Sequence, residues 1–124
     1  MNFDFNSERP IYLQIASELE DAVFTGAYPE ETQIPSTTEL SVTLKINPAT
    51  VLKGMNILVD EHIIYKKRGL GMFVSTGAVE IIRTKRQKNF YDNFILPLLS
   101  EAEKLGLEEK DIISLLEGGK NNEH

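Results

Sequence analysis

The sequence predicts a mainly α (α+β) fold in which three helices and a β-hairpin form one unit and a short two-helix tail follows. Two helix starts, each with its own capping residue, lie close together around Ser36 and Asn47. Two β-rich segments separated by glycines follow the second of these helices, and a separate apolar pattern begins after Thr76-Gly77. A chain of 124 residues accommodates one compact domain of this kind with a small appendage.

The first helix is predicted over Pro10 to Thr25, after a flexible arm at 1–9. Proline suits the first turn of a helix, and Gly26 is placed to end it. Apolar residues recur at helical spacing along this segment: Ile15, Ala16, Leu19, Ala22 and Val23.

The second and third helices are predicted at about 37–44 and 48–61. Ser36 and Glu39 have the spacing of a capping box, in which each side chain accepts from the other residue's backbone N–H. Asn47 is a favoured N-cap, and Pro48 at the first helical position loses an N–H that has no partner there. Because only a tight turn around Lys45-Ile46 separates the helices, the sequence predicts a helix-turn-helix, a motif whose second helix enters the DNA major groove.

A β-hairpin is predicted from 63–67 and 72–75, joined by the turn Arg68-Gly69-Leu70-Gly71, whose two glycines can supply positive φ. A hairpin directly after a helix-turn-helix is a wing. Residues 10–76 are therefore predicted to form a winged helix-turn-helix DNA-binding domain.

The tail is predicted at 77–118, with a kink or break at Pro97, a helix end at Gly106 and a frayed end at 119–124. Its apolar stripe is too large for a short tail to bury alone, so packing against a second copy is expected; packing back on the first helix is the competing account. The predicted dimer interface comprises Phe90, Tyr91, Phe94, Ile95, Leu98 and Leu99.

Composition argues against several other classes of protein. The chain has no cysteine, and its two histidines, His62 and His124, are far apart, so no metal site or cofactor is expected. It shows no nucleophile–histidine pair and no phosphate-binding loop, which argues against an enzyme. No apolar run approaches the ~18 residues of a membrane span, and the first ten residues lack the pattern of a signal peptide. A cytoplasmic protein that does not contact membranes is expected.

The net charge of −6 conceals a basic region. Residues 45–88 hold nine basic and three acidic side chains, whereas the rest of the chain holds four basic and sixteen acidic ones. DNA binding requires a local basic face rather than a basic whole, so double-stranded DNA remains the expected partner. The basic residues at 83–88 are interpreted as a solvated helix face, with a second phosphate patch as the alternative.

Candidate DNA-binding residues cluster at the two helix starts and the wing, and each also has a purely structural interpretation. Ser36 and Asn47 are caps first, and Thr37 and Thr38 lie where a helix N-terminus can bind phosphate. Arg68 is the strongest candidate, because glycines beside it let the backbone approach DNA and arginine can enter the minor groove; the alternative is an ordinary exposed turn. The full set is Ser36, Thr37, Thr38, Asn47, Ala49, Thr50, Lys53, Lys66, Arg68, Gly69 and Gly71.

These residues resemble those of the gluconate-repressor (GntR) family of bacterial transcription regulators. The matching motifs are Pro10-Ile11-Tyr12-Leu13-Gln14-Ile15, Ile34-Pro35-Ser36, Glu39-Leu40, Thr50-Val51 and 68–74. The turn at 47–51 and the tail motifs Leu98-Leu99, Ala102 and Leu105-Gly106-Leu107 resemble the YtrA branch, whose short tail serves dimerisation.

The resemblance implies a homodimeric repressor of a palindromic operator, often of an ABC-transporter operon that includes its own gene. Thr38, Pro48 and Leu52 stand where many relatives have arginine. Since arginine is the commonest reader of guanine, the operator is expected to differ from theirs. A tail this short leaves room for only a small effector pocket, and the alternatives are the dimer interface and the space between the tail and the winged domain. The alternative function is a winged-helix protein-interaction adaptor without sequence-specific DNA binding.

Overall fold

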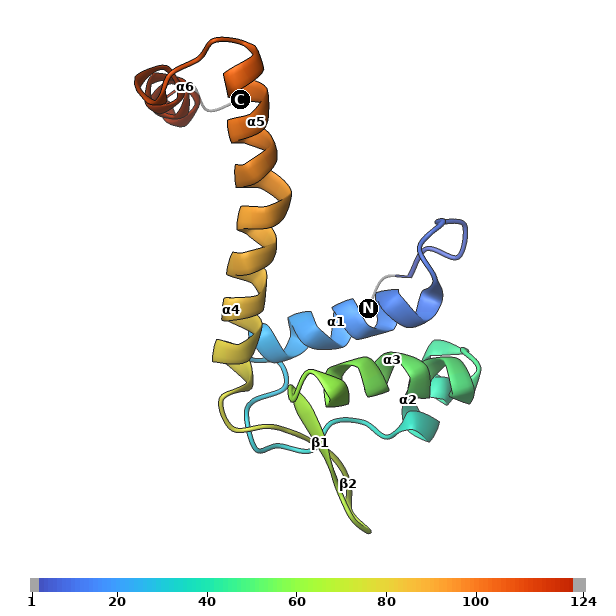
Figure 1. Cartoon of the computed structure of the whole chain (residues 1–124). Coiled ribbons are helices and arrows are strands. Elements are labelled where there is room, and N and C mark those ends of the chain that lie inside the picture. Colours follow the sequence, from blue (N-terminus) through green and yellow to red (C-terminus); the bar gives the residue numbers. More distant parts are fainter. Residues whose placement is uncertain (1–2, 122–124) are drawn as a thin grey trace. The chain divides into compact units, whose positions relative to one another are not determined.

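The computed structural model describes residues 3–121 and divides into two compact units, the first ending at Thr84 and the second beginning at Lys85 (Figure 1). The first unit contains α1 (Ile11–Phe24), α2 (Thr37–Leu44), α3 (Pro48–Asp60), β1 (Ile64–Lys67), β2 (Gly71–Val74) and the start of α4 (Ala78–Phe90). The second contains the rest of α4, the π-helical segment η1 (Tyr91–Ile95), α5 (Leu96–Lys104) and α6 (Glu109–Asn121). The predicted winged helix-turn-helix is confirmed, as is the helical nature of the tail.

The core of the first unit lies between α1, α3 and the base of the hairpin. Figure 1 shows α1 and α3 side by side, with the hairpin extending beyond them. Gly54 of α3 permits their close approach, because a Cβ there would lie 2.7 Å from the carbonyl oxygen of Tyr12 and 2.9 Å from Cγ2 of Ile15. Among the side chains that lose all or nearly all solvent contact are Ile15, Leu19, Val51, Met55, Leu58 and Ile63.

The hairpin is antiparallel, with Tyr65 opposite Phe73 and Lys66 opposite Met72. A third segment, which the sequence pattern did not reveal, pairs with β2 on its other side. The Ile34 N–H donates to the Met72 carbonyl at 3.0 Å, and the Val74 N–H donates to the Thr32 carbonyl at 3.0 Å. The connection between α1 and α2 therefore supports the wing.

One predicted boundary is corrected. The joint expected at 76/77 lies later, because Ala78 and Ile82 of α4 are fully buried in the core of the first unit. The described part of the arm, residues 3–9, forms hydrogen bonds with α1. The Gln14 side chain accepts from the Asp4 N–H at 2.8 Å and donates to the Arg9 carbonyl at 2.9 Å.

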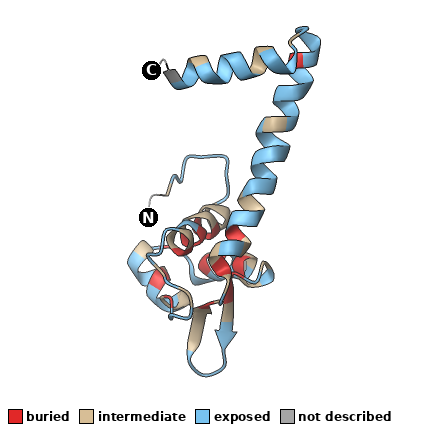
Figure 2. Cartoon of the chain, turned by 90° about the vertical axis from the view of Figure 1, so that its left-hand side faces the viewer, coloured by how far each residue is buried: buried red, intermediate tan, exposed pale blue. Residues whose placement is uncertain are grey.

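Of the kink or break predicted at Pro97, no break is present, because helical structure continues from the π-helical segment into α5. The Leu96 N–H donates to the Tyr91 carbonyl five residues back, which is the wider π-helical pattern. In an α-helix a proline ring clashes with the carbonyl four residues before it, and the wider turn relieves that conflict. Figure 2 shows the second unit exposed over most of its length, with Ala102 as a buried position.

The last helix also extends further than expected, since α6 runs through Gly118-Gly119 to Asn121. Glycine in a helix costs only about 1 kcal/mol relative to alanine, so two glycines need not end one. Of the predicted frayed end, residues 122–124 lie outside the described residues. Across residues 3–121, no helix has the length and apolar character needed to cross a bilayer.

Candidate nucleic-acid interface

The start of α2 has the predicted capping box. The Ser36 hydroxyl accepts from the Glu39 N–H at 3.0 Å, and the Glu39 carboxylate accepts from the Ser36 N–H at 3.2 Å. The Thr37 hydroxyl donates to Sδ of Met55 at 3.5 Å and so turns inward, whereas Thr38 is exposed. At this helix start, Thr38 therefore offers a free hydroxyl and Thr37 offers its backbone N–H.

The turn between α2 and α3 is held by side chains as well as backbone. Lys45 adopts the left-handed conformation with φ 57°, and the Ser41 hydroxyl donates to the Ile46 carbonyl at 2.6 Å. The Asn47 side chain accepts from the Ala49 N–H at 2.8 Å, with Pro48 in the first turn. The predicted cap role of Asn47 is therefore confirmed.

The outer face of α3 carries Ala49, Leu52, Lys53 and Asn56, all exposed, while Thr50 is half-buried. The Lys53 ammonium lies 4.0 Å from the centre of the Tyr12 ring in a cation–π contact. This contact directs Lys53 toward α1, which the sequence pattern gave no means of predicting.

The wing separates its two lysines, as strand alternation requires. Lys66 lines a groove of about 390 Å³ together with residues of α2 and α3. Lys67 lies on the other face, 4.6 Å from the centre of the Phe73 ring. The groove lined by Lys66 is completed by Ser36, Thr37, Thr38, Leu52, Asn56, Gly71 and Met72.

Arg68 and Gly69 lie exposed at the tip of the wing. Gly69 has φ 77° with open space where a Cβ would be, whereas a Cβ at Gly71 would lie 2.7 Å from Nε2 of Gln33. That Gln33 nitrogen donates to the Leu70 carbonyl at 2.6 Å. The connection between α1 and α2 therefore fixes the wing tip, and Gly71 leaves the space for it.

Two neighbouring carboxylates join that connection to the start of α4. Glu30 accepts from the Gly77 and Val79 N–H groups at 2.8 and 3.1 Å, and these bonds lower the pKa of its carboxyl. Glu31, at φ 65°, accepts from the Thr76 hydroxyl at 2.6 Å and the Tyr65 hydroxyl at 3.0 Å, and these bonds lower its pKa. We call this arrangement the Glu30–Glu31 clasp.

The basic residues of α4 are partly committed to local contacts. Arg83 forms an ion pair with Glu80 and lies 5.6 Å from the centre of the Phe24 ring. Lys88 donates to the Asp92 carboxylate at 2.7 Å, which raises the Lys88 pKa. These pairs agree with a solvated helix face.

His62 is an exposed residue in the left-handed conformation just after α3. The described residues contain no group of three or more potential metal ligands.

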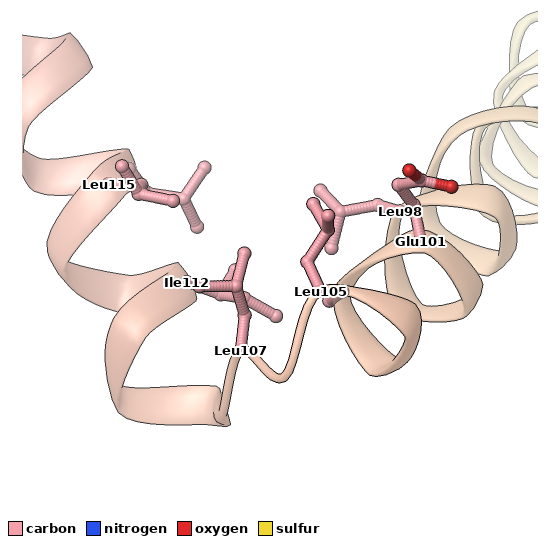
Figure 3. A pocket seen from close by; sticks show the side chains of 8 residues that line it. Leu98, Glu101, Leu105, Leu107, Ile112 and Leu115 are labelled. Atoms are coloured by element: carbon pink, nitrogen blue, oxygen red, sulfur yellow. The ribbon is translucent and has the colours of Figure 1, made fainter.

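The predicted interface residues of the tail are exposed, except that Ile95 is half-buried. The Phe90 and Phe94 rings pack together, with their ring centres 5.7 Å apart. The second unit also holds an apolar hollow of about 310 Å³, where Leu98 and Leu105 face Ile112 and Leu115 (Figure 3). Sequence analysis did not assign a site to α6, although its Leu115 and Leu116 are more than 60% exposed.

Together, these features place the start of α2, the middle of α3 and one face of the wing around a single surface. Most of the predicted DNA-binding residues lie on it or at the wing tip, although Lys53 is turned toward α1 and Thr50 is half-buried. A capped helix-turn-helix followed by a wing defines the class of winged helix-turn-helix DNA-binding proteins.

Residues 11–74 match the family model described as bacterial regulatory proteins of the gntR family. The chain therefore belongs to the GntR family, which consists of transcription regulators rather than enzymes. Within the family it is YtrA-like.

Three comparisons illustrate the relationship. The HTH-type transcriptional repressor YtrA of Bacillus subtilis is 29% identical, over 99% of each chain. A crystal structure of a GntR-family regulator from Bacteroides thetaiotaomicron is 32% identical, with a TM-score of 0.77, covering 92% of this chain and 99% of that one. The DNA-binding domain of AraR in complex with operator ORX1 is 26% identical, with a TM-score of 0.55, covering 60% of this chain and 93% of that one.

Proposed function

We propose that the protein is a dimeric, sequence-specific repressor that binds a palindromic operator. The helix at 48–61 enters the major groove and the wing at 66–73 enters the minor groove. The observation that carries this proposal is the single surface formed by the α2 start, α3 and Lys66, with Arg68 projecting at the wing tip. The AraR domain supports it, since that similar fold is bound to an operator.

Most of the predicted residues have a proposed role on this surface or beside it. The Thr37 backbone N–H and the Thr38 hydroxyl bind phosphate at the helix start that Ser36 caps, and Lys66 adds a phosphate contact. Ala49 and Thr50 lie at the start of α3, where base edges are contacted, and Asn47 holds that start in place. Arg68 enters the minor groove, with Gly69 allowing the close approach of the backbone and Gly71 leaving space for the Gln33 side chain that holds the wing tip.

Dimerisation is proposed to occur through the tail. Its exposed apolar side chains include Phe90, Phe94, Leu115 and Leu116, each more than half exposed. Exposed apolar surface on this scale marks an interaction site, and a second copy would bury it symmetrically. Two half-sites would then lie about 34 Å, or one DNA turn, apart.

Regulation of its own operon, with ABC-transporter genes among the targets, is proposed from similarity to YtrA, which is itself described as a repressor.

The apolar hollow of the second unit, with the Glu101 carboxylate at its edge, is the proposed place for a small-molecule effector. A cytoplasmic location remains a prediction. An adaptor function is the second candidate, favoured by the acidic remainder of the chain.

The test is binding of the pure protein to DNA upstream of its own gene, against scrambled DNA, at two salt concentrations. The mass of the protein–DNA complex is determined in the same experiment. The expected result is tight, sequence-dependent binding by a dimer. Weak, salt-sensitive binding to both DNAs would favour the adaptor function.

Arg68→Ala tests the wing directly. We expect the variant to bind the operator more than tenfold more weakly with an unchanged Tm, because Arg68 is exposed and only its DNA contact is lost. Lys110→Ala removes the same charge from the tail and should leave affinity nearly unchanged. Equal affinity of Arg68→Ala and the wild-type protein would contradict the wing assignment.

A further inference from the structure

The outer face of α3 has a crest formed by two residues. One groove lies between α3, the α2 start and the wing, and a second lies between α3 and Tyr12 of α1. Leu52 and Asn56 line both grooves, so they form the ridge that separates them. The part of a helix that projects furthest reaches the floor of the major groove first.

Lys53 does not belong to this crest, although it is exposed on the same helix. Its ammonium is held 4.0 Å from the centre of the Tyr12 ring, on the α1 side. A charge held there suits a phosphate at the groove edge better than a base. The crest therefore presents an uncharged pair of side chains.

The chemistry of the pair is specific. Leu52 is 43% exposed, so its side chain is available for an apolar contact. Asn56 is exposed, and nothing within residues 3–121 hydrogen-bonds its side-chain amide. In the major groove the apolar group on offer is the thymine methyl, and a side-chain amide can bond adenine at both N6 and N7.

We infer that Leu52 and Asn56 determine which operator this protein binds, with Leu52 covering a thymine methyl and Asn56 pairing with adenine. The inference rests on the proposed function. Four residues span about 6 Å of helix, against about 3.4 Å per base pair. The two contacts therefore fall within one or two base pairs of each other, which predicts a short A·T step in each half-site.

Selection of bound sequences from a random DNA library, with the full-length protein, tests the inference. The wild-type protein should enrich a palindrome containing this A·T step. Leu52→Arg should change the thymine position to guanine, because arginine pairs with guanine O6 and N7. Asn56→Ala should reduce the preference for adenine about tenfold at its own position alone.

Val42→Arg is the matched control, because Val42 is 73% exposed on α2, lines neither groove, and the change adds the same charge as Leu52→Arg. It should leave the motif unchanged. Thermal unfolding of each variant establishes that it is folded. A motif unaltered by both Leu52→Arg and Asn56→Ala would overturn the inference and leave the proposed function intact, whereas the absence of any wild-type motif would remove both.

Discussion

Gly54→Ala tests the close approach of α1 and α3. The added Cβ would lie 2.7 Å from the carbonyl oxygen of Tyr12, against a carbon–oxygen contact of about 3.3 Å, so α1 must move by about 0.6 Å. Overpacking of this kind costs about 1–3 kcal/mol. The upper end applies because the obstructing atom belongs to the backbone and cannot rotate away.

Alanine also gains about 1 kcal/mol of helix propensity over glycine. The net loss is therefore about 2 kcal/mol, which corresponds to a Tm lower by about 8–16 °C for a unit of this size. Thermal unfolding followed by circular dichroism measures it. Gly119→Ala is the control, since no atom lies within 4 Å of its added Cβ and only the propensity gain remains. A Tm of Gly54→Ala equal to or above that of the wild-type protein would refute the packing argument.

Two further predictions concern the clasp and the tail. Glu30→Gln should lower the Tm at pH 7, because the folded pKa of Glu30 lies below its ordinary 4.5; that stabilisation is present above 4.5 and is lost as the pH falls through the folded value. The gap between variant and wild type should therefore close in acid, with Glu8→Gln as a control; a gap independent of pH would contradict the assignment. Leu115→Glu should halve the mass measured by sedimentation and weaken operator binding about a hundredfold, because the two halves then bind separately. Ser114→Glu, with the same charge on the same helix, should remain dimeric; a dimer that survives Leu115→Glu would place the interface elsewhere.

Local chemistry accounts for how closely the first unit could be predicted. The Ser36–Glu39 box and the Asn47-Pro48 pair define helix starts within a few residues, so α2 and the start of α3 lie where expected. The Glu30–Glu31 clasp joins residues as far apart as 49 positions in the chain, and no local pattern encodes that. No local pattern distinguishes Gly54 from other helical glycines, because its role depends on the close contact with Tyr12 and Ile15 of α1.

The candidate site was predictable as a set of residues but not as an arrangement. Strand alternation required Lys66 and Lys67 to face opposite ways, and only the fold shows that Lys66 joins the groove. The contact of Lys53 with Tyr12 depends on two helices that are distant in sequence. In the tail, Pro97 predicted a kink or a break, but no local pattern predicted the π-helical segment that precedes it.

The π-helical segment Tyr91–Ile95 acts as a one-residue insertion within a helix. Each residue advances an α-helix by about 100°, so the extra residue rotates the face of α5 by roughly that angle relative to an uninterrupted continuation of α4. Homologues that differ in length by one residue here would present a different side of α5 to a partner. Alignments of such tails should therefore be anchored separately on either side of this segment, because a continuous helical register carried across it would assign the wrong residues to the apolar face.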